Sequence, residues 1–389
     1  MRMLPTVLRT FVLAALLQVM GSNAFAQTRY IVTNDDAAFP FPNGVSFFLE
    51  NASGLLTFQQ QVNTGGYGIN GGYFGENRLA VANDGQENCV FASQASSGNI
   101  VGVIVSSQTV GGVAFGSETD SGLSNGIGLL ASGGYLYASF TDSNTIGTFK
   151  IQTGCNLMFI NDTTVSGLNG GVINAMAANG PMLVTSFTDG SIQSFNISSG
   201  TPTSNGDEQI STITRKTYGA SFPNQIEITK DGHYAIFGAT STAVAVEVSD
   251  LSSGKLSPTV AFGSLFAISS SNILLSPDET VLYAVNTQGD AVSAFFFDKS
   301  SGRLKYGCKS GPIKGQSGSW SYLSGAALVS DSGNGGGVYV AEFGGTSGIA
   351  LVRYSSTGTG KCTLQEDPAS PFLDAKSTGL LSIVVATSQ

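Results

Sequence analysis

Acidic and amide side chains recur immediately after short apolar segments, and they are the residues best suited to chemistry in this chain. Their oxygens could ligate Ca²⁺, which takes about six to eight oxygen ligands in proteins. Two carboxylates could instead act as acid and base on a sugar-like substrate. A third interpretation is structural, since Asp and Asn close β-hairpins through Asx turns. The residues of this set are Asn34, Asp35, Asp36, Asp142, Asp189, Asn286, Asp290 and Glu342.

A second set combines aromatic, amide and charged side chains in the segments that separate the apolar repeats. Aromatic rings offer apolar contact area and amides orient a ligand, so this mixture suits flat or sugar-like molecules. Packing inside the fold is the competing use of the aromatic residues. Trp320, the single tryptophan, follows the Gly- and Ser-rich stretch Gly315–Ser319 and is expected to be exposed. The candidates are Tyr73, Glu76, Arg78, Asn224 and Trp320.

Several classes of function are disfavoured by what the chain lacks. Its single histidine, His233, cannot supply the usual zinc ligand sets or readily form a Ser-His-Asp triad. Phosphate-loop and dinucleotide motifs need a strand–helix context that is missing here. Acidic residues outnumber basic ones by 26 to 17, whereas nucleic-acid binding needs clustered positive charge. We therefore predict no required cofactor, with Ca²⁺ as an optional ion, and no nucleic-acid partner.

The composition indicates a turn-rich, all-β fold. The chain has 51 Gly in 389 residues and is only 11% charged, against averages of about 7% and about 25%. Because 41% of the residues are hydrophobic, intrinsic disorder is disfavoured. No Gly-X-Y period is present, and the scarcity of Lys, Glu and Arg argues against a long helical protein.

An internal repeat defines the architecture. The segment Ser139-Phe-Thr-Asp142 recurs as Ser186-Phe-Thr-Asp189, 47 positions later. The same period-2 strand pattern, a bulky residue followed two positions on by another apolar residue, occurs seven times. Four strands can be assigned to each copy. Expected first strands include Ile226–Thr229 and Ile273–Leu275, and the expected second strands are Tyr135–Phe140, Met182–Phe187, Tyr234–Gly238, Val281–Asn286 and Val338–Glu342. Stacking seven such units around an axis buries both faces of every sheet, as in a seven-bladed β-propeller. The bulky residues are Phe47, Val103, Phe149, Phe195, Val246, Phe295 and Val352.

The two ends of the repeat array predict how the ring closes. Tyr30–Asn34 resembles a second strand with no first strand before it, and Leu381–Ala386 is an unassigned strand at the other end. Pairing these two segments would complete one blade and remove the exposed sheet edges. An open β-sandwich or a β-helix remains as the alternative, although neither explains the sevenfold recurrence.

The four cysteines allow three disulfide connectivities. The repeat places Cys89 and Cys155 in neighbouring blades, and Cys308 and Cys362 in another neighbouring pair. The other pairings would cross the ring, which is too far for Cα atoms that a disulfide holds about 4.4–6.8 Å apart. We predict Cys89–Cys155 and Cys308–Cys362, which also indicates an oxidising compartment.

The first 26 residues are predicted to be a cleaved signal peptide. Arg2 and Arg9 precede the apolar run Phe11–Met20, and Ala24-Phe-Ala26 matches the small-x-small cleavage pattern. The apolar run is too short to span a bilayer, which needs about 20 residues. Residues 27–389 are therefore predicted to form one secreted or periplasmic domain without membrane insertion.

Blade 6 carries the clearest family resemblance. Its run Leu275-Ser-Pro-Asp278, Leu282–Asn286, Val292–Phe295 and Ser301–Leu304 resembles the seven-bladed propeller lactonase family, which includes propeller-type 6-phosphogluconolactonases. Tyr30–Asn34 is also similar to the Tyr-Val-Thr-Asn repeat of surface proteins.

That resemblance places Gly75–Arg78 and Phe222–Gln225 near the mouth of the central channel. It also implies lactone hydrolysis, for which Glu76 would be the base and Arg78 the partner of the oxyanion. A carboxylate in the set listed first is the alternative base.

Three functional hypotheses follow for a protein that we expect to be monomeric. The first is a module that binds a small carbohydrate-like ligand or a protein partner on the loop face of the channel. The second is a hydrolase of a sugar-type lactone, and the third is a structural module of the cell surface. The predicted ligand-binding residues are Asn34, Tyr73, Asp142, Asp189, Asn224, Asn286, Trp320 and Glu342.

Overall fold

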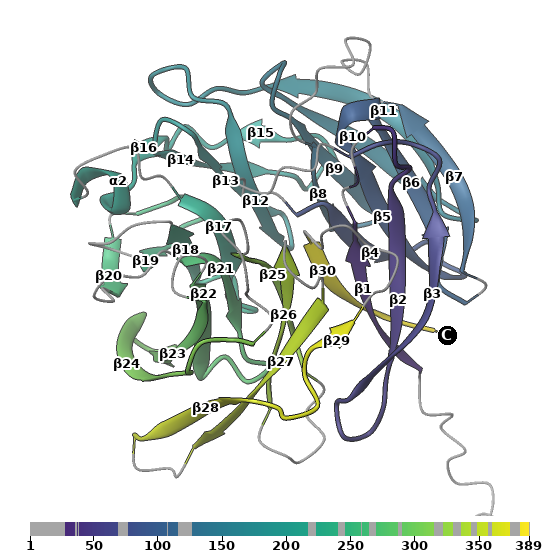
Figure 1. The fold of residues 1–389 in the computed structure, drawn as a ribbon. Helices are drawn as coiled ribbons and strands as arrows, with labels where there is room; N and C mark the ends of the chain where they lie inside the picture. The colour runs from purple at the N-terminus through teal and green to yellow at the C-terminus, as the bar shows by residue number, and fades with distance from the viewer. Residues whose placement is uncertain are drawn as a thin grey trace, which may run out of the picture.

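Seven antiparallel sheets, formed by the described residues, are arranged around one axis as the blades of a β-propeller (Figure 1). The computed structural model describes residues 28–35, 37, 39–68, 77–106, 108–115, 127–216, 223–239, 246–257, 259–263, 270–286, 290–314, 322–329, 336–343, 348–356, 360–373 and 382–388. The predicted fold class is confirmed. The predicted signal peptide lies outside the described residues.

Each blade runs from an innermost to an outermost strand. Blade 1 comprises β30 (Ser382–Thr387), β1 (Arg29–Asn34), β2 (Gly44–Glu50) and β3 (Leu56–Asn63). Blade 2 comprises β4 (Leu79–Asn83), β5 (Asn88–Gln94), β6 (Asn99–Ile104) and β7 (Thr109–Phe115), with a 3₁₀ turn at Ala95–Ser97. Blade 3 comprises β8 (Ile127–Ser132), β9 (Tyr135–Phe140), β10 (Thr145–Gln152) and β11 (Asn156–Thr164).

The remaining blades follow the same order, with small additions at their outer edges. Blade 4 comprises β12 (Ile173–Asn179), β13 (Met182–Phe187), β14 (Ser191–Asn196), β15 (Thr203–Ser204) and β16 (Gln209–Ile210), followed by α2 (Thr212–Lys216). Blade 5 comprises β17 (Pro223–Ile228), β18 (Tyr234–Ala239), β19 (Val246–Asp250) and β20 (Thr259–Gly263). Blade 6 comprises β21 (Ser270–Leu275), β22 (Val281–Asn286), β23 (Ala291–Asp298) and β24 (Arg303–Lys309). Blade 7 comprises β25 (Tyr322–Leu328), β26 (Gly337–Phe343), β27 (Gly348–Ser356), β28 (Cys362–Glu366) and β29 (Phe372–Leu373).

The ring closes through the two ends of the chain, as predicted. Strand β30 pairs antiparallel with β1 from Arg29↔Thr387 to Asn34↔Ser382, and it is the innermost strand of blade 1. Figure 1 shows the yellow β30 beside the purple β1. The innermost strands contact one another in the closed order β30, β4, β8, β12, β17, β21, β25.

The hydrophobic core consists of layers between neighbouring blades. Side chains of a strand alternate between its two faces, so each blade packs on both neighbours. In β26, Val338 and Val340 pack against blade 6, whereas Tyr339 and Ala341 pack against blade 1. Seven such clusters among the described residues occupy the seven interfaces between blades.

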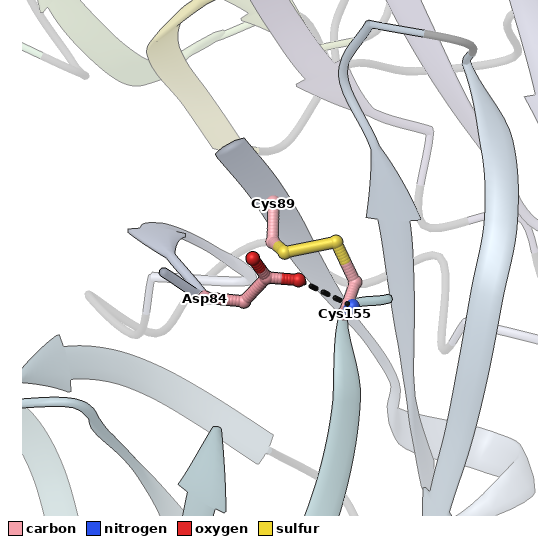
Figure 2. A group of neighbouring side chains, drawn as sticks. All are labelled: Asp84, Cys89 and Cys155. Atoms are coloured by element: carbon pink, nitrogen blue, oxygen red, sulfur yellow. Dashed lines mark hydrogen bonds between the residues drawn. A yellow bond between two sulfur atoms is a disulfide. The ribbon is translucent and has the colours of Figure 1, made fainter. Parts of the chain in front are cut away.

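Both predicted disulfides are present and each joins adjacent blades. Cys89 of β5 bonds to Cys155 in the β10–β11 turn, and Cys308 of β24 bonds to Cys362 of β28, with Cα atoms 5.6 Å apart in each pair. Figure 2 shows the first of these bonds beside Asp84. No helix in the described part of the chain is long and apolar enough to cross a membrane.

Strand starts differ from the sequence expectation in the innermost strands. The apolar pattern predicts strands from Ile226 and Ile273, but β17 begins at Pro223 and β21 at Ser270. In both cases the added residues are polar or Pro, which an edge strand tolerates because one of its edges is unpaired within the sheet. A register shift also occurs in each extension, between Pro223 and Gln225 and between Ser270 and Asn272.

Candidate functional site

A cavity of about 640 Å³ follows the axis of the propeller. Its lining comes from the innermost strands β4, β8, β17, β21, β25 and β30, together with Arg29 of β1 and residues that flank the innermost strands. Each of these strands pairs with only one neighbour in its own sheet, so its other edge borders the axis. The volume lies in the range of about 300–1,000 Å³ that is usual for small-molecule sites.

One end of the cavity is lined by uncharged polar side chains. They lie near the beginning of the innermost strands. At this end of the propeller the chain passes from one blade to the next, and the loops between the second and third strands also lie here. We call this end the polar mouth. It comprises Asn77, Gln225, Asn272, Ser324 and Ser382, from five of the seven blades.

The polar mouth includes residues from both stretches that the lactonase resemblance places there. Asn77 belongs to Gly75–Arg78 and Gln225 belongs to Phe222–Gln225, and both line the cavity. The expectation that these stretches lie near the mouth is therefore met by their described residues.

β-Bulges help to position the side chains of the mouth. Register shifts occur between Pro223 and Gln225, between Ser270 and Asn272, and between Leu323 and Gly325. A bulge adds one unpaired residue to a strand and changes the direction of the side chains around it.

Amide side chains form hydrogen bonds between neighbouring blades near the starts of the same innermost strands. The Nδ2 atom of Asn272 donates to the carbonyl oxygen of Ser324 over 2.8 Å. The Nδ2 atom of Asn174 donates in the same way to Pro223 over 2.6 Å. These bonds hold the mouth in a defined geometry before any ligand arrives.

Arg78 is completely buried directly behind the mouth. Its backbone N–H donates to Ser382 Oγ over 2.8 Å, and its Nη1 donates to the carbonyl oxygen of Ile127 over 3.4 Å. Arg78 thus connects blades 1, 2 and 3. Its predicted partnership with an oxyanion stays a prediction.

Three predicted ligand-binding residues occupy similar places in adjacent blades. Asn34, Asn286 and Glu342 stand at the ends of the second strands of blades 1, 6 and 7, and each is fully buried. Asn34 Nδ2 donates to the Ser93 carbonyl over 3.4 Å, and Asn286 Nδ2 donates to Ser293 Oγ over 3.0 Å. None of the three is among the described residues that line the cavity.

Glu342 is the unusual member of that group. Neither carboxyl oxygen has a hydrogen-bond partner among the described residues. Burial, reinforced by the negative charge of Glu366, raises the pKa of Glu342 to about 8. The side chain is therefore mostly a neutral acid at pH 7.

The other predicted polar residues have different surroundings. Asp189 accepts hydrogen bonds from Ser191 and from the backbone N–H groups of Asn169 and Gly171, so it closes turns as the structural interpretation requires. Burial acts to raise the pKa of Asp189, but these hydrogen bonds outweigh it and lower the pKa. Asp142 is exposed in the turn after β9, and Asn224 is buried in the bulge of β17.

Tyr73, Glu76 and Trp320, which the sequence nominates for the loop face, lie outside the described residues. Their predicted roles as ligand-binding residues or, for Glu76, as a catalytic base remain predictions.

Sequence reasoning missed Glu227, the only acidic residue that lines the cavity among the described residues. It lies toward the end of β17, away from the polar mouth. Burial and the nearby negative charge of Glu279 raise the pKa of Glu227 to about 8. A detectable signal was its position between Ile226 and Ile228, where a charged residue interrupts an apolar strand.

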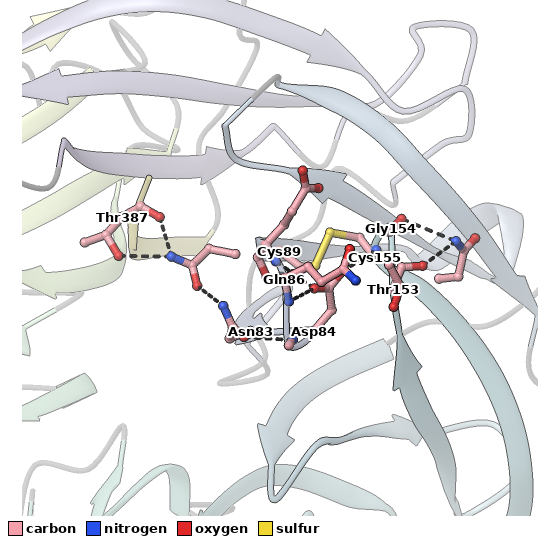
Figure 3. The surroundings of a disulfide bond; sticks show 12 residues. Asn83, Asp84, Gln86, Cys89, Thr153, Gly154, Cys155 and Thr387 are labelled. Carbon is pink, nitrogen blue, oxygen red and sulfur yellow. Dashed lines mark hydrogen bonds between the residues drawn. A yellow bond between two sulfur atoms is a disulfide. The ribbon is translucent and has the colours of Figure 1, made fainter. Parts of the chain in front are cut away.

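The described residues contain one group with metal-ligand spacing, Asp84, Cys89 and Cys155. The two sulfur atoms are joined in a disulfide and cannot act as thiolate ligands. Asp84 accepts hydrogen bonds from Gln86, Glu87 and Cys155 N–H groups (Figure 3). This group therefore stabilises a turn and is not a metal centre. The predicted optional Ca²⁺ remains a prediction.

Comparison with known proteins supports the fold. No family model matches the chain, and no curated protein is similar to it in sequence. The solved structure of a candidate 6-phosphogluconolactonase from Bacteroides fragilis matches with a TM-score of 0.66 and 15% identity, over 95% of this chain and 99% of that one. A similar candidate from Bacteroides uniformis matches with a TM-score of 0.66 and 13% identity, over 93% and 99% of the two chains.

An exported protein is also among the similar structures. The periplasmic gluconolactonase of Pseudomonas aeruginosa matches with a TM-score of 0.57 and 15% identity, over 74% of this chain and 83% of that one. At these identities the likeness concerns the fold. The chain is a seven-bladed β-propeller, and its fold is similar to that of proteins named as 6-phosphogluconolactonases and as a gluconolactonase. The resemblance read from blade 6 is thereby confirmed at the level of the fold.

Proposed function

We propose that this protein is an exported binding module for a small, neutral, polyhydroxylated molecule such as a sugar or a sugar lactone. The observation that carries the proposal is the polar mouth. Five blades contribute amide or hydroxyl side chains to one end of an axial cavity, and none of these five side chains is charged.

The chemistry of the mouth favours this ligand class over a phosphorylated one. Amides and hydroxyls both donate and accept hydrogen bonds, which matches the hydroxyl groups of a sugar. A phosphate would require basic groups, and none belongs to the described residues of the polar mouth. The formal charge of −9 further disfavours anionic ligands.

Two disulfides between blades support export, because such bonds persist in oxidising compartments. The fold likeness to a periplasmic gluconolactonase is consistent with the same location.

Calorimetric titration with glucose and with glucono-1,5-lactone tests the binding proposal. Gln225→Ala removes a buried amide of the mouth and should weaken sugar binding about 10-fold or more. One hydrogen bond contributes about 0.5–1.5 kcal/mol, and the sugar hydroxyl that the amide would contact is left unpaired. Gln59→Ala, an exposed amide on β3, is the matched control and should leave the affinity unchanged. Absence of binding by the wild-type protein to a panel of neutral sugars and lactones would instead support the surface-module hypothesis.

Lactone hydrolysis is the second candidate, favoured by the fold likeness to proteins named as gluconolactonases. In this reaction a water oxygen bonds to the lactone carbonyl carbon, the ring C–O bond breaks, and the released alkoxide takes up a proton. Glu76 would accept a proton from the attacking water, and Arg78 would stabilise the oxyanion.

A direct assay separates binding from catalysis. The rate of opening of glucono-1,5-lactone is measured with the wild-type protein and with Glu76→Gln, against the spontaneous rate in buffer. A wild-type rate that falls at least 100-fold in Glu76→Gln would support the enzyme. A wild-type rate equal to that in buffer, with binding retained, would leave only the binding module.

A further inference from the structure

The end of the cavity opposite the polar mouth has a different chemistry. Here the lining consists of aliphatic side chains near the ends of the innermost strands, together with Glu227 of β17 and Arg29 of β1. We call this end the apolar half. Its aliphatic members include Val81, Ala131, Leu274, Leu328 and Val385.

Two charged residues line the cavity among the described residues, Arg29 and Glu227, and only Arg29 is neutralised. The Arg29 guanidinium pairs with Glu50 and also donates to the carbonyl oxygen of Leu328. Glu227 has no hydrogen bond or ion pair with any described residue.

The charged groups around Glu227 are committed elsewhere. Glu279, which lies in blade 6 beside it, pairs with Lys299 over 3.0 Å and accepts the backbone N–H of Lys230. The Lys230 ammonium donates to the carbonyl oxygen of Pro277. No described cation therefore contacts the Glu227 carboxyl group, and the charge that acts on its pKa is that of another carboxylate, Glu279.

We propose that the apolar half is a second binding site, specific for a small organic ammonium whose hydrocarbon part lies against the aliphatic walls and whose charged nitrogen pairs with Glu227. The apolar walls exclude a hydrated inorganic ion, because Ca²⁺ takes about six to eight oxygen ligands and the described lining offers one carboxylate. The site lies at the other end of the channel from the sugar site and does not depend on that proposal.

The electrostatics make binding depend on pH. Burial and Glu279 hold the pKa of Glu227 near 8, so most of the empty sites are protonated at neutral pH. An ammonium ion pairs only with the ionised carboxylate, and the apparent affinity scales with the ionised fraction. Binding should therefore strengthen about 30-fold from pH 6.5 to pH 9, and should release about one proton per ligand near pH 7.

Titration calorimetry with n-butylammonium chloride tests the site. The alkylamine stays protonated at both pH values, since such amines ionise near the lysine value of about 10.4. Repeating the titration at pH 7 in two buffers of different ionisation enthalpy measures proton release in the wild-type protein without any variant. Neutral n-butanol should bind at least 10-fold more weakly at pH 9.

Glu227→Gln keeps the shape of the site and removes its charge, so it should abolish the pH dependence and lower the affinity at pH 9 at least 10-fold. Glu208→Gln is the matched control, because Glu208 also has a raised pKa but does not line the cavity. Equal affinity in wild type and Glu227→Gln, tighter binding at low pH, or no proton release would overturn the proposal. Displacement of the amine by millimolar CaCl₂ would point to a metal site instead. Sugar binding at the mouth should persist in Glu227→Gln, which separates the two proposals.

Discussion

Asn34 and Ser382, although 348 positions apart in the chain, are directly paired across β1 and β30. Ser382 lines the polar mouth, and Asn34 is buried beside it. The pair that closes the ring therefore also builds the candidate site. Stability of the ring and integrity of the mouth should consequently fail together when β30 is disturbed.

Ile383→Asp tests this closure. Ile383 is 6% exposed between blades 7 and 1, so an aspartate there places an unpaired charge in an apolar layer. We expect a loss of at least about 3 kcal/mol in the free energy of unfolding, measured by urea denaturation. Thr57→Asp, on the exposed outer strand β3, should change it by less than about 0.5 kcal/mol. A similar small loss in both variants would show that β30 is dispensable for the ring.

Gly102→Ala tests the close packing of blade 3 on blade 2. A Cβ atom at Gly102 would lie 2.1 Å from the carbonyl oxygen of Cys155, so the backbone beside the disulfide would have to move. We expect a destabilisation of about 1–3 kcal/mol, read from thermal or urea unfolding. Gly311→Ala is the matched control, because no atom lies within 4 Å of its added Cβ. Equal stability of the two variants would contradict the packing described here.

Asp189 predicts a pH dependence of stability in the acid range. Its pKa is lower in the folded protein than the unfolded value of about 3.9, because hydrogen bonds to the carboxylate outweigh burial. The stabilisation is fully present above about pH 5 and is lost as pH falls through the folded pKa. In urea unfolding from pH 7 to pH 3, Asp189→Asn should start less stable than wild type and the gap should narrow as the pH falls. A gap that stays constant would refute this assignment.

The raised pKa of Glu342 predicts the opposite pH dependence, in which the free energy of unfolding falls as the pH rises. Its pKa of about 8 lies above the unfolded value of about 4.3, so the folded protein binds the extra proton between these values. Its contribution to stability is fully present below about pH 4 and is lost as pH rises through 8. Glu342→Gln should therefore gain stability relative to wild type, by a few kcal/mol in total as the pH rises from about 4 to 9. An identical pH profile for both proteins would show that Glu342 is paired.

Local patterns were enough to predict much of the fold. The strands Tyr135–Phe140, Met182–Phe187 and Val281–Asn286 match the expected second strands residue for residue. Both disulfides follow from the repeat register, because only neighbouring blades bring cysteines within bonding distance. Periodicity of two and turn chemistry are encoded within a few residues, so they can be recognised without a structure.

Glu227 shows where such patterns stop. In the sequence it is one acidic residue between two isoleucines. Its place on the axial cavity depends on β21 and β25, which lie roughly fifty and one hundred positions further along the chain. Similarly, the polar ends of the second strands are visible in sequence, but the burial of Glu342 follows from the stacking of blade 7 on blade 6.

The sequence by itself determined the number of blades, the closure of the ring, the disulfides and the two stretches that reach the mouth. Only the tertiary structure decided which polar side chains line the cavity, because neighbouring blades and the bulges in the innermost strands set that choice. The exposure and the charge state of each of these side chains depend on residues far away in the chain, because those residues exclude water from around it. The repeat itself is local, and for that reason it could be read directly.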